Sequence, residues 1–156
     1  MRMIKVNTME VFYEAALTEA KKAYEENEVP VGCVIVKDGE IIGRGRNRME
    51  TTHDPSAHAE VMAIKEATSD LHNWRLSGCT RYVTLEPCLM CAAIIRKSRI
   101  GSIVIGAIEP NEGAFGSALS INHLPPSERH VEATWLHDQV SEDLMKNFFK
   151  ELRNTC

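Results

Sequence analysis

The stretch TRYVTLEPCLMCAAIIRKSRIGSIVIGA, residues 80–107, decides the fold class. Residues 80–86 are rich in β-branched and aromatic side chains and predict a strand. Pro87 stands where a helix is expected to begin, since its missing N–H costs nothing at the first helical position. Residues 88–98 continue that helix, and SIVIGA at 102–107 predicts another strand. Strand, helix and strand at this spacing are typical of a right-handed parallel crossover.

Upstream of this crossover the sequence predicts a helix, a hairpin and a second helix. Asn7 and Glu10 have the spacing of a helix-capping box. Asp38-Gly39 predicts a tight turn between two antiparallel strands. A loop at 48–55 is expected before the second helix. The expected elements are a helix at 7–28, strands at 31–36 and 40–47, and a helix at 57–69.

Downstream, a loop at 108–129 is rich in Gly, Pro and polar residues, and a loop of this length is usually functional. We expect a short helix within it near 117–123, a fifth strand at 130–136 and a closing helix at 138–153. That helix places Val140, Leu144, Phe148 and Leu152 on one stripe. The whole pattern predicts an α/β fold, a mixed sheet of about five strands with helices on both faces, as a single domain over 1–156.

Composition narrows the class of protein. The 156 residues are 44% hydrophobic and 26% charged, which fits a globular chain with one core. No apolar run approaches the roughly 18 residues of a membrane span, and the N-terminus lacks the apolar region of a signal peptide. We therefore expect a cytoplasmic protein with no membrane partner.

The net charge of −4 gives no overall attraction to nucleic acid. Local basic patches remain possible, although a solvated surface is the more common role of any single cluster. The three clusters are Arg44, Arg46 and Arg48; Arg96, Lys97 and Arg99; and Lys146, Lys150 and Arg153.

Five cysteines, an odd number, argue against a disulfide framework. Cys88 and Cys91 lie three residues apart at the start of the predicted helix. This spacing suits a redox pair, a closed structural zinc site or an open catalytic zinc site. A redox pair leaves His58 and Glu60, in AHAEV, without a role. A closed zinc site needs a fourth protein ligand, and none is evident, because Cys33 lies in an apolar strand, Cys79 precedes a strand and Cys156 is terminal.

An open site uses all of these residues, and we favour it. His58, Cys88 and Cys91 would hold Zn²⁺, water would take the fourth position, and Glu60 would move protons. His-x-Glu followed by Pro-Cys-x-x-Cys is the general signature of zinc deaminases. On a regular helix His58 and Glu60 would diverge by about 200°. We therefore expect this stretch to open the helix, with Ser56 as its N-cap.

Two longer stretches, PSAHAEVMAI at 55–64 and RYVTLEPCLMCAAIIRKSRIGSIVIGA at 81–107, resemble the cytidine deaminase superfamily, and within it the TadA-type tRNA adenosine deaminases. The similarity runs from about Phe12 to Arg153. It implies a three-layer α/β/α fold, one zinc per subunit and a homodimer whose partner helps to build the RNA site. By position, His58, Cys88 and Cys91 match the ligands and Glu60 the proton shuttle. We expect the substrate to contact Asn47, Val29, Pro30, Ala59, Glu86 and Pro87.

One segment departs from the tRNA deaminase pattern. Those enzymes carry Asn-His-Arg before the last strand, whereas this chain has PPSERHVEA, with Glu128 at the asparagine position. EGAFGS at 112–117 matches the Gly-rich loop only in part. DPSAHAEV and PPSERH are similar to the guanine deaminase branch of the superfamily, and an acidic residue suits the N–H groups of guanine.

Three functions follow. The first is hydrolysis of adenosine to inosine at the wobble position of a tRNA anticodon loop, whose base would enter the pocket flipped out. The second is deamination of a small purine, guanine above all, or of another free base or nucleoside. The third is an inactive zinc-binding, RNA-associated subunit, against which Glu60 argues. We predict the first, because TLEPCLMCAAI matches closely and the last helix carries the basic cluster Lys146, Lys150 and Arg153.

Overall fold

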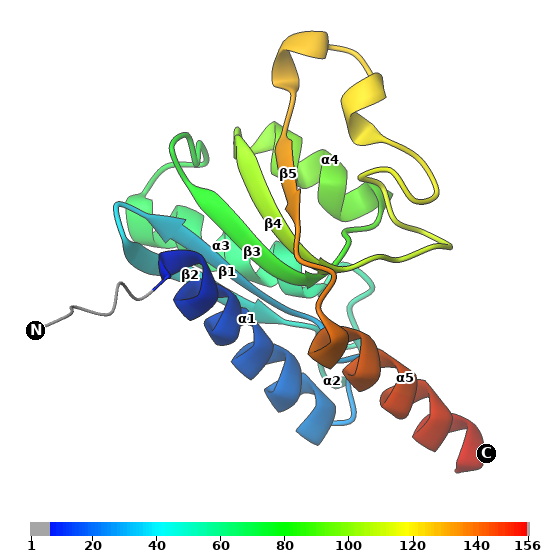
Figure 1. The fold of residues 1–156 in the computed structure, drawn as a ribbon. Helices are drawn as coiled ribbons and strands as arrows, with labels where there is room; N and C mark the ends of the chain where they lie inside the picture. Colours follow the sequence, from blue (N-terminus) through cyan, green and yellow to red (C-terminus); the bar gives the residue numbers. More distant parts are fainter. Residues whose placement is uncertain (1–6, 156) are drawn as a thin grey trace, which may run out of the picture.

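The computed structural model describes residues 7–155, in which a five-stranded mixed sheet lies between two layers of helices (Figure 1). The strand order is β2-β1-β3-β4-β5. β1 pairs antiparallel with β2 and β3, whereas β3, β4 and β5 are parallel. The predicted α/β class, mixed sheet and parallel crossover are therefore confirmed. The strands are β1 Gly32–Lys37, β2 Glu40–Arg46, β3 Thr80–Leu85, β4 Ser102–Ala107 and β5 Glu132–Trp135.

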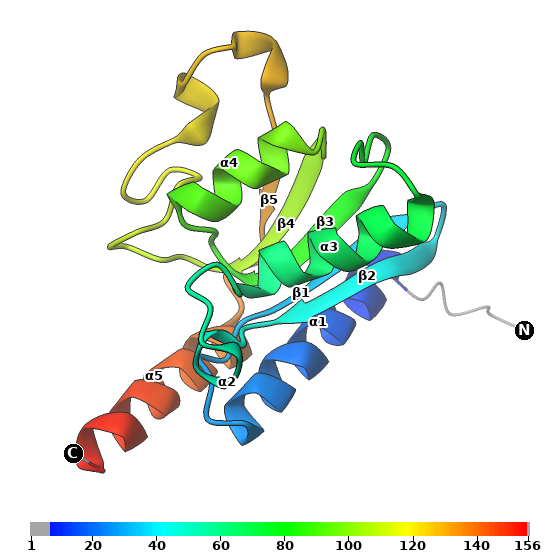
Figure 2. The same cartoon turned by 180° about the vertical axis from the view of Figure 1, so that it is seen from behind.

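Helices cover both faces of this sheet. α1 and α5 lie on one face, and α3 and α4 on the other, as the two opposite views show (Figures 1 and 2). Within residues 7–155, none of the helices has the length and apolar character needed to cross a bilayer. The helices are α1 Thr8–Glu25, α2 Met49–Thr52, α3 Ala59–Leu71, α4 Leu89–Lys97 and α5 Gln139–Asn154, with 3₁₀ turns η1 Ile121–His123 and η2 Ser127–Arg129.

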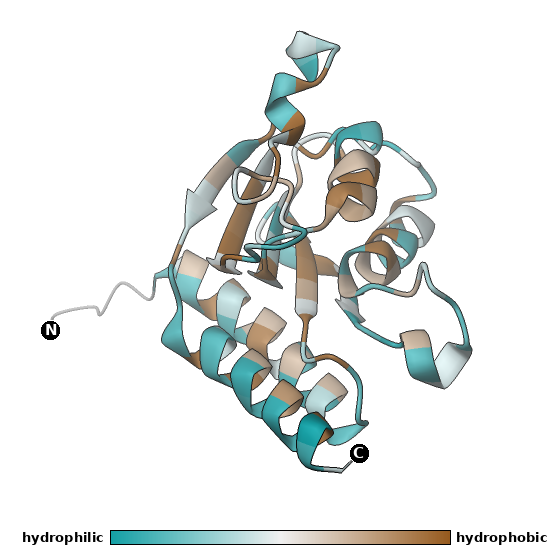
Figure 3. Ribbon diagram, turned by 90° about the vertical axis from the view of Figure 1, so that its right-hand side faces the viewer, coloured by the Kyte–Doolittle hydropathy of each residue, from teal (hydrophilic) through white to brown (hydrophobic). Residues whose placement is uncertain are grey.

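Alternation along the strands divides the apolar core in two. On β1, Cys33 and Ile35 face α3 and α4, whereas Val34 and Val36 face α1. Both sets are buried because side chains alternate along a strand and helices cover each side of the sheet. Figure 3 shows the result: the strands are mainly hydrophobic, and α1 and α5 mix hydrophobic and hydrophilic residues along their length.

Two local predictions hold in detail. Asn7 caps α1, its side-chain oxygen accepting a hydrogen bond from Met9 N at 3.1 Å. Asp38 and Gly39 form the turn between β1 and β2, with φ angles of 50° and 78°. Both angles are positive, as the type I′ hairpin turn requires.

Other boundaries differ from prediction because the expected capping residues take part in other hydrogen bonds. The loop at 48–55 contains α2. α3 begins at Ala59 with His58 as N-cap, while Ser56 Oγ bonds to Asp54 Oδ1 at 2.7 Å. α4 begins at Leu89, so Pro87 precedes the N-cap Cys88. The carbonyl of Pro87 accepts Ala114 N at 2.8 Å, which holds this segment extended.

Two predictions in the last third of the chain also need correction. The short helix expected near 117–123 is limited to η1, and η2 follows it. On α5, Val140 and Leu152 of the predicted apolar stripe are exposed. α5 is instead attached at its start, where Tyr13 OH donates to Asp138 Oδ2 at 2.9 Å and also hydrogen-bonds with Ser141 Oγ. The predicted stripe therefore packs only in part against the rest of the chain.

α3 packs very closely against β2. A Cβ on Gly45 would meet Ala63 N at 2.6 Å, and one on Gly43 would meet Ala67 N at 2.9 Å. Ala59, Ala63 and Ala67 present the facing surface of α3 and are fully buried. Only glycine opposite alanine allows this distance, so these residues determine where the first turn of α3 lies above the sheet.

We expect Gly45→Ala to lower the free energy of unfolding by about 1–3 kcal/mol or more, the range for an overfilled core. The added methyl would press against backbone atoms of α3, which cannot turn aside. Urea denaturation measures the change. Gly101→Ala is the control, because a Cβ there meets nothing within 4 Å; an equal loss in that variant would contradict the packing argument.

Candidate active site

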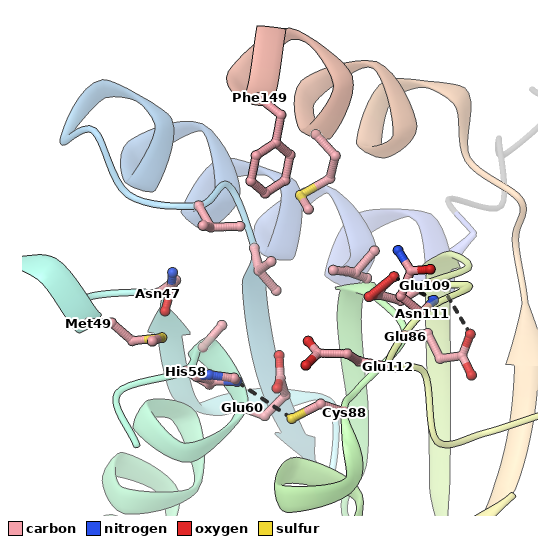
Figure 4. A pocket seen from close by; sticks show the side chains of 15 residues that line it. Asn47, Met49, His58, Glu60, Glu86, Cys88, Glu109, Asn111, Glu112 and Phe149 are labelled. Atoms are coloured by element: carbon pink, nitrogen blue, oxygen red, sulfur yellow. Dashed lines mark hydrogen bonds between the residues drawn. The ribbon is translucent and has the colours of Figure 1, made fainter. Parts of the chain in front are cut away.

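Four chain segments converge at one edge of the sheet. They are the turn before β1, the end of β2, the end of β3 and the end of β4. Because β3 and β4 are parallel, their carboxyl ends meet at this edge, and α3 begins beside them. Figure 4 shows the side chains of these segments turned toward a common space, with Phe149 of α5 above it.

The three predicted metal ligands lie together at this edge. His58 Nδ1 is 3.7 Å from Cys88 Sγ and 3.5 Å from Cys91 Sγ. Zinc bonds of about 2.0 Å to nitrogen and 2.3 Å to sulfur, at a tetrahedral angle, place those atoms about 3.5 Å apart. The cluster therefore fits one zinc ion. Within residues 7–155 this is the single such group of three, and neither Cys33 nor Cys79 joins it.

Two helix starts place these ligands. His58 is the N-cap of α3 and has extended backbone angles (φ −76°, ψ 154°). The divergence of about 200° expected on a regular helix therefore does not apply between His58 and Glu60. Cys88 is the N-cap of α4, and Cys91 follows one turn later. The positive ends of both helix dipoles point toward the cluster and favour thiolate ligands.

The three groups share protons among themselves. A hydrogen bond from Cys91, helped by one from His58, lowers the pKa of Cys88 to about 4 despite burial. The same bond to Cys88, together with burial, raises the pKa of Cys91. The bond with Cys88 also raises the pKa of His58. Zinc binds thiolate and neutral imidazole, so binding would displace these protons.

Glu60 lies beside the cluster and is only 3% exposed. Burial raises its pKa, and a hydrogen bond with Cys91 and the charge of Arg81 act in the opposite direction. A carboxylate whose pKa is raised toward neutrality suits proton transfer at physiological pH. Figure 4 shows its side chain directed toward the space between His58 and Cys88.

Arg81 is a supporting residue that the sequence patterns did not single out. It is fully buried on β3, and its Nη2 donates to the carbonyl oxygen of Glu60 at 2.9 Å. This contact ties the first turn of α3 to the central strand and places a positive charge beneath Glu60. An arginine inside the otherwise apolar strand TRYVTL was the available signal, since a buried charge needs a partner.

A cavity of about 380 Å³ opens above Glu60, a volume within the general range of small-molecule sites. Asn47 is on its wall and is 6% exposed, and its Oδ1 has no hydrogen-bond partner within the described part of the chain. Val29, Ala59 and Glu86 also line the cavity, whereas Pro30 and Pro87 are buried beside it. The remaining lining residues are Val31, Met49, His58, Leu85, Cys88, Glu109, Asn111, Glu112, Met145 and Phe149.

Besides Val31 and Leu85, sequence reasoning did not identify six of these lining residues: Met49, Glu109, Asn111, Glu112, Met145 and Phe149. None belongs to a short motif, and they come from a loop, α2 and the last helix. Glu128, which the sequence analysis singled out, is exposed on η2. It lines neither this cavity nor a second cavity that adjoins it.

Comparison with known proteins agrees with this geometry. Residues 6–107 match the family model of the cytidine and deoxycytidylate deaminase zinc-binding region. The chain is 43% identical over 145 residues to a tRNA-specific adenosine deaminase of Aquifex aeolicus, covering 93% of this chain and 96% of that protein. It is 42% identical over 147 residues to the tRNA-specific adenosine deaminase of Bacillus subtilis, covering 92% and 90%.

Solved structures extend the comparison. One from a study of A-to-I editing by tRNA:A34 deaminases has a TM-score of 0.80 and 40% identity, covering 83% of this chain and all of that one. A guanine deaminase from Bacillus subtilis has a TM-score of 0.61 and 31% identity, covering 76% and 90%. The matched zinc-binding region contains His58, Cys88 and Cys91. The chain therefore belongs to the cytidine and deoxycytidylate deaminase family and is a zinc-dependent hydrolytic deaminase.

Proposed function

We propose that this protein deaminates adenosine to inosine at the wobble position of tRNA. The observation that carries the proposal is the arrangement of Glu60, His58 and Cys88 on the floor of a cavity of about 380 Å³, with Cys91 buried beside them. The resemblance to tRNA-specific adenosine deaminases over more than nine-tenths of the chain supports the choice of base and of RNA.

His58, Cys88 and Cys91 would hold the zinc ion, whose chemistry is to lower the pKa of a water molecule to about 7. Glu60 then handles the protons. Hydrolysis adds the water oxygen to the carbon that carries the amine and releases ammonia. One proton of the water ends on the leaving nitrogen and the other on the adjacent ring nitrogen. Glu60, buried and beside the cluster, is placed to accept and deliver both.

Substrate contacts are proposed for the cavity wall. Asn47 offers a buried amide whose oxygen can accept a hydrogen bond from the bound nucleoside. Val29 and Ala59 supply apolar contact area for the base. Pro30 and Pro87 adjoin Val29 and Cys88 and are proposed to shape the wall from behind.

The RNA strand would continue into a second cavity of about 610 Å³, which shares Leu85, Glu109, Asn111, Met145 and Phe149 with the first. Lys146 and Arg153 of α5 line it, so they are our candidates for phosphate contacts. Lys146 is exposed and pairs with Glu142 of the same helix at 2.9 Å. Two members of the other basic clusters are engaged elsewhere in the protein. Arg46 is paired with Glu26 at 2.8 Å, and Arg96 donates to three loop carbonyl oxygens.

We also propose a homodimer acting in the cytoplasm. The dimer is an expectation from the family resemblance, in which a partner subunit completes the RNA site. A mature tRNA substrate supports the cytoplasmic location. Sedimentation of the zinc-loaded protein, with and without an anticodon stem-loop, tests the assembly.

Guanine deamination is the second candidate, and a specific observation favours it. Glu109 and Glu112 line the cavity, and carboxylates accept hydrogen bonds from the N–H groups on a guanine edge. Apart from Glu60 and Glu86, these two side chains, and not Glu128, are the acidic groups that line the cavity. The guanine deaminase structure at 31% identity supports this alternative.

We expect the purified chain to contain one zinc per molecule and Cys88→Ala to lose it, because two remaining ligands bind zinc too weakly. Metal analysis by mass spectrometry after dialysis gives the ratio. Cys79→Ala removes a thiol outside the cluster and should keep full zinc. Full occupancy in Cys88→Ala would refute the ligand assignment.

Glu60→Gln should retain zinc and fold but lose at least about 10²–10⁴-fold in kcat, because the amide cannot carry protons. Ammonia release from an adenosine-containing anticodon stem-loop measures turnover, and metal analysis checks the zinc. Near-normal kcat in the zinc-loaded variant would remove Glu60 from the mechanism.

Lys146→Ala and Arg153→Ala should each weaken stem-loop binding and lower the slope of log affinity against log salt by about 0.7, the single-strand value for one phosphate contact. Lys97→Ala, at the opposite end of α4 from Cys88, is the matched control. The alternative function predicts a different pattern: no stem-loop binding at low salt, and rapid ammonia release from guanine that falls in Glu112→Gln and not in Glu128→Ala.

A further inference from the structure

Glu86 is a buried carboxylate, 2% exposed, that the proposed mechanism does not use. We infer that Glu86 is a positioning residue: it holds the segment 109–117 in place as one wall of the base cavity and thereby sets how the base is read. The expected effect on KM rests on the proposed function. The expected effect on the segment 109–117 can be measured without any substrate.

Four donors of the segment 109–117 converge on this carboxylate. Oε1 accepts hydrogen bonds from Glu109 N at 3.1 Å and from Ser117 Oγ. Oε2 accepts from Phe115 N at 2.9 Å and from Ser117 N at 3.2 Å. Donors from both ends of the segment are thus gathered at one point, and Figure 4 shows the bond between Glu86 and Glu109 at the edge of the cavity.

The backbone in the middle of the segment passes directly against the same carboxylate. A Cβ on Gly113 would lie 2.5 Å from Glu86 Oε1, so no larger residue fits there without a shift. On its other side, Gly113 pairs with Cys88, and Ala114 N donates to Pro87 O at 2.8 Å. The segment is therefore fitted between Glu86 and the start of α4.

The segment contributes three polar side chains to the cavity, those of Glu109, Asn111 and Glu112. Asn111 and Glu112 are exposed and have few contacts of their own to hold them. Their position relative to the base therefore depends on the backbone beneath them. Glu86 holds that backbone at both ends. Through this support, Glu86 influences which base the cavity accepts.

Glu86 was expected from the sequence to contact the substrate, and its hydrogen bonds argue for a different role. A carboxylate has about four lone-pair sites, and all four accept bonds from the protein. No acceptor capacity is left for a base or a sugar. Support of Cys88 is the remaining alternative, and zinc content distinguishes it from support of the wall.

The test is Glu86→Gln, which keeps the volume of the side chain. An amide has one acceptor oxygen, and its NH₂ group would face two of the four donors. We expect hydrogen exchange at the amides of Phe115 and Ser117 to accelerate at least about tenfold while zinc content stays at one per chain. With the stem-loop as substrate, KM should rise about tenfold, with a smaller change in kcat, because the lost contacts act on binding.

Arg96→Gln is the matched control. Arg96 is also buried, and it supports a later part of the connection between β4 and β5. It donates hydrogen bonds to the carbonyl oxygens of Ile121, Leu124 and Pro126. It should lower thermal stability without changing exchange at Phe115 and Ser117 or the KM. Ser117→Ala, which removes one of the four donors, should show the same changes as Glu86→Gln at smaller size, and it serves if Glu86→Gln does not fold.

Three outcomes would overturn the inference: unchanged exchange and KM in both Glu86→Gln and Ser117→Ala, loss of zinc in Glu86→Gln, or equal changes in Arg96→Gln. If the native protein does not deaminate the stem-loop, the proposed function fails. The exchange measurement would still decide whether Glu86 holds the wall.

Discussion

The contact between α3 and β2 is the constraint on which the rest of the site depends. Gly43 and Gly45 have no side chains, and Ala59, Ala63 and Ala67 face them, so the helix lies almost on the backbone of the strand. This distance places the first turn of α3, with His58 and Glu60, level with the start of α4. A metal site tolerates errors of only a few tenths of an ångström in its ligands, and rigid backbone packing supplies that precision better than flexible side chains do.

Buried charges organise the layer around this contact. Arg81 sits beneath Glu60 and donates to its carbonyl oxygen, so the carboxylate that we propose as proton shuttle and its supporting cation lie in the same apolar core. Glu28, only 1% exposed, accepts Glu50 N at 3.1 Å and Thr51 N at 2.8 Å, and so holds α2, which brings Met49 to the cavity. Glu86 holds the segment 109–117, the other wall of the cavity, in the same way. Each of these two walls is an irregular segment that a buried carboxylate stabilises through backbone N–H groups.

Different parts of the fold hold the zinc ligands and line the cavity. Regular elements, the starts of α3 and α4, hold the zinc ligands, because metal coordination is the least tolerant part of the chemistry. Loops and the lightly attached α5 hold the residues that surround the base. Within a family that acts on different bases, the loops can change while the floor of the site remains the same.

The sequence by itself determined the fold class, picked out the three residues that could hold zinc and predicted Glu60 as the proton shuttle. These features depend on local patterns: alternating apolar strands, a crossover of fixed length, and His-x-Glu and Pro-Cys-x-x-Cys at helix starts. The sequence did not place Ser56 or Pro87 correctly. Ser56 bonds locally to Asp54, and Pro87 is held by Ala114, which only folding brings near it. Only the tertiary structure brought Met49, Glu112 and Phe149 to one cavity, directed Glu86 to the loop and left Glu128 outside. Those residues are far apart along the chain, and their proximity results from packing between elements, which no local periodicity encodes.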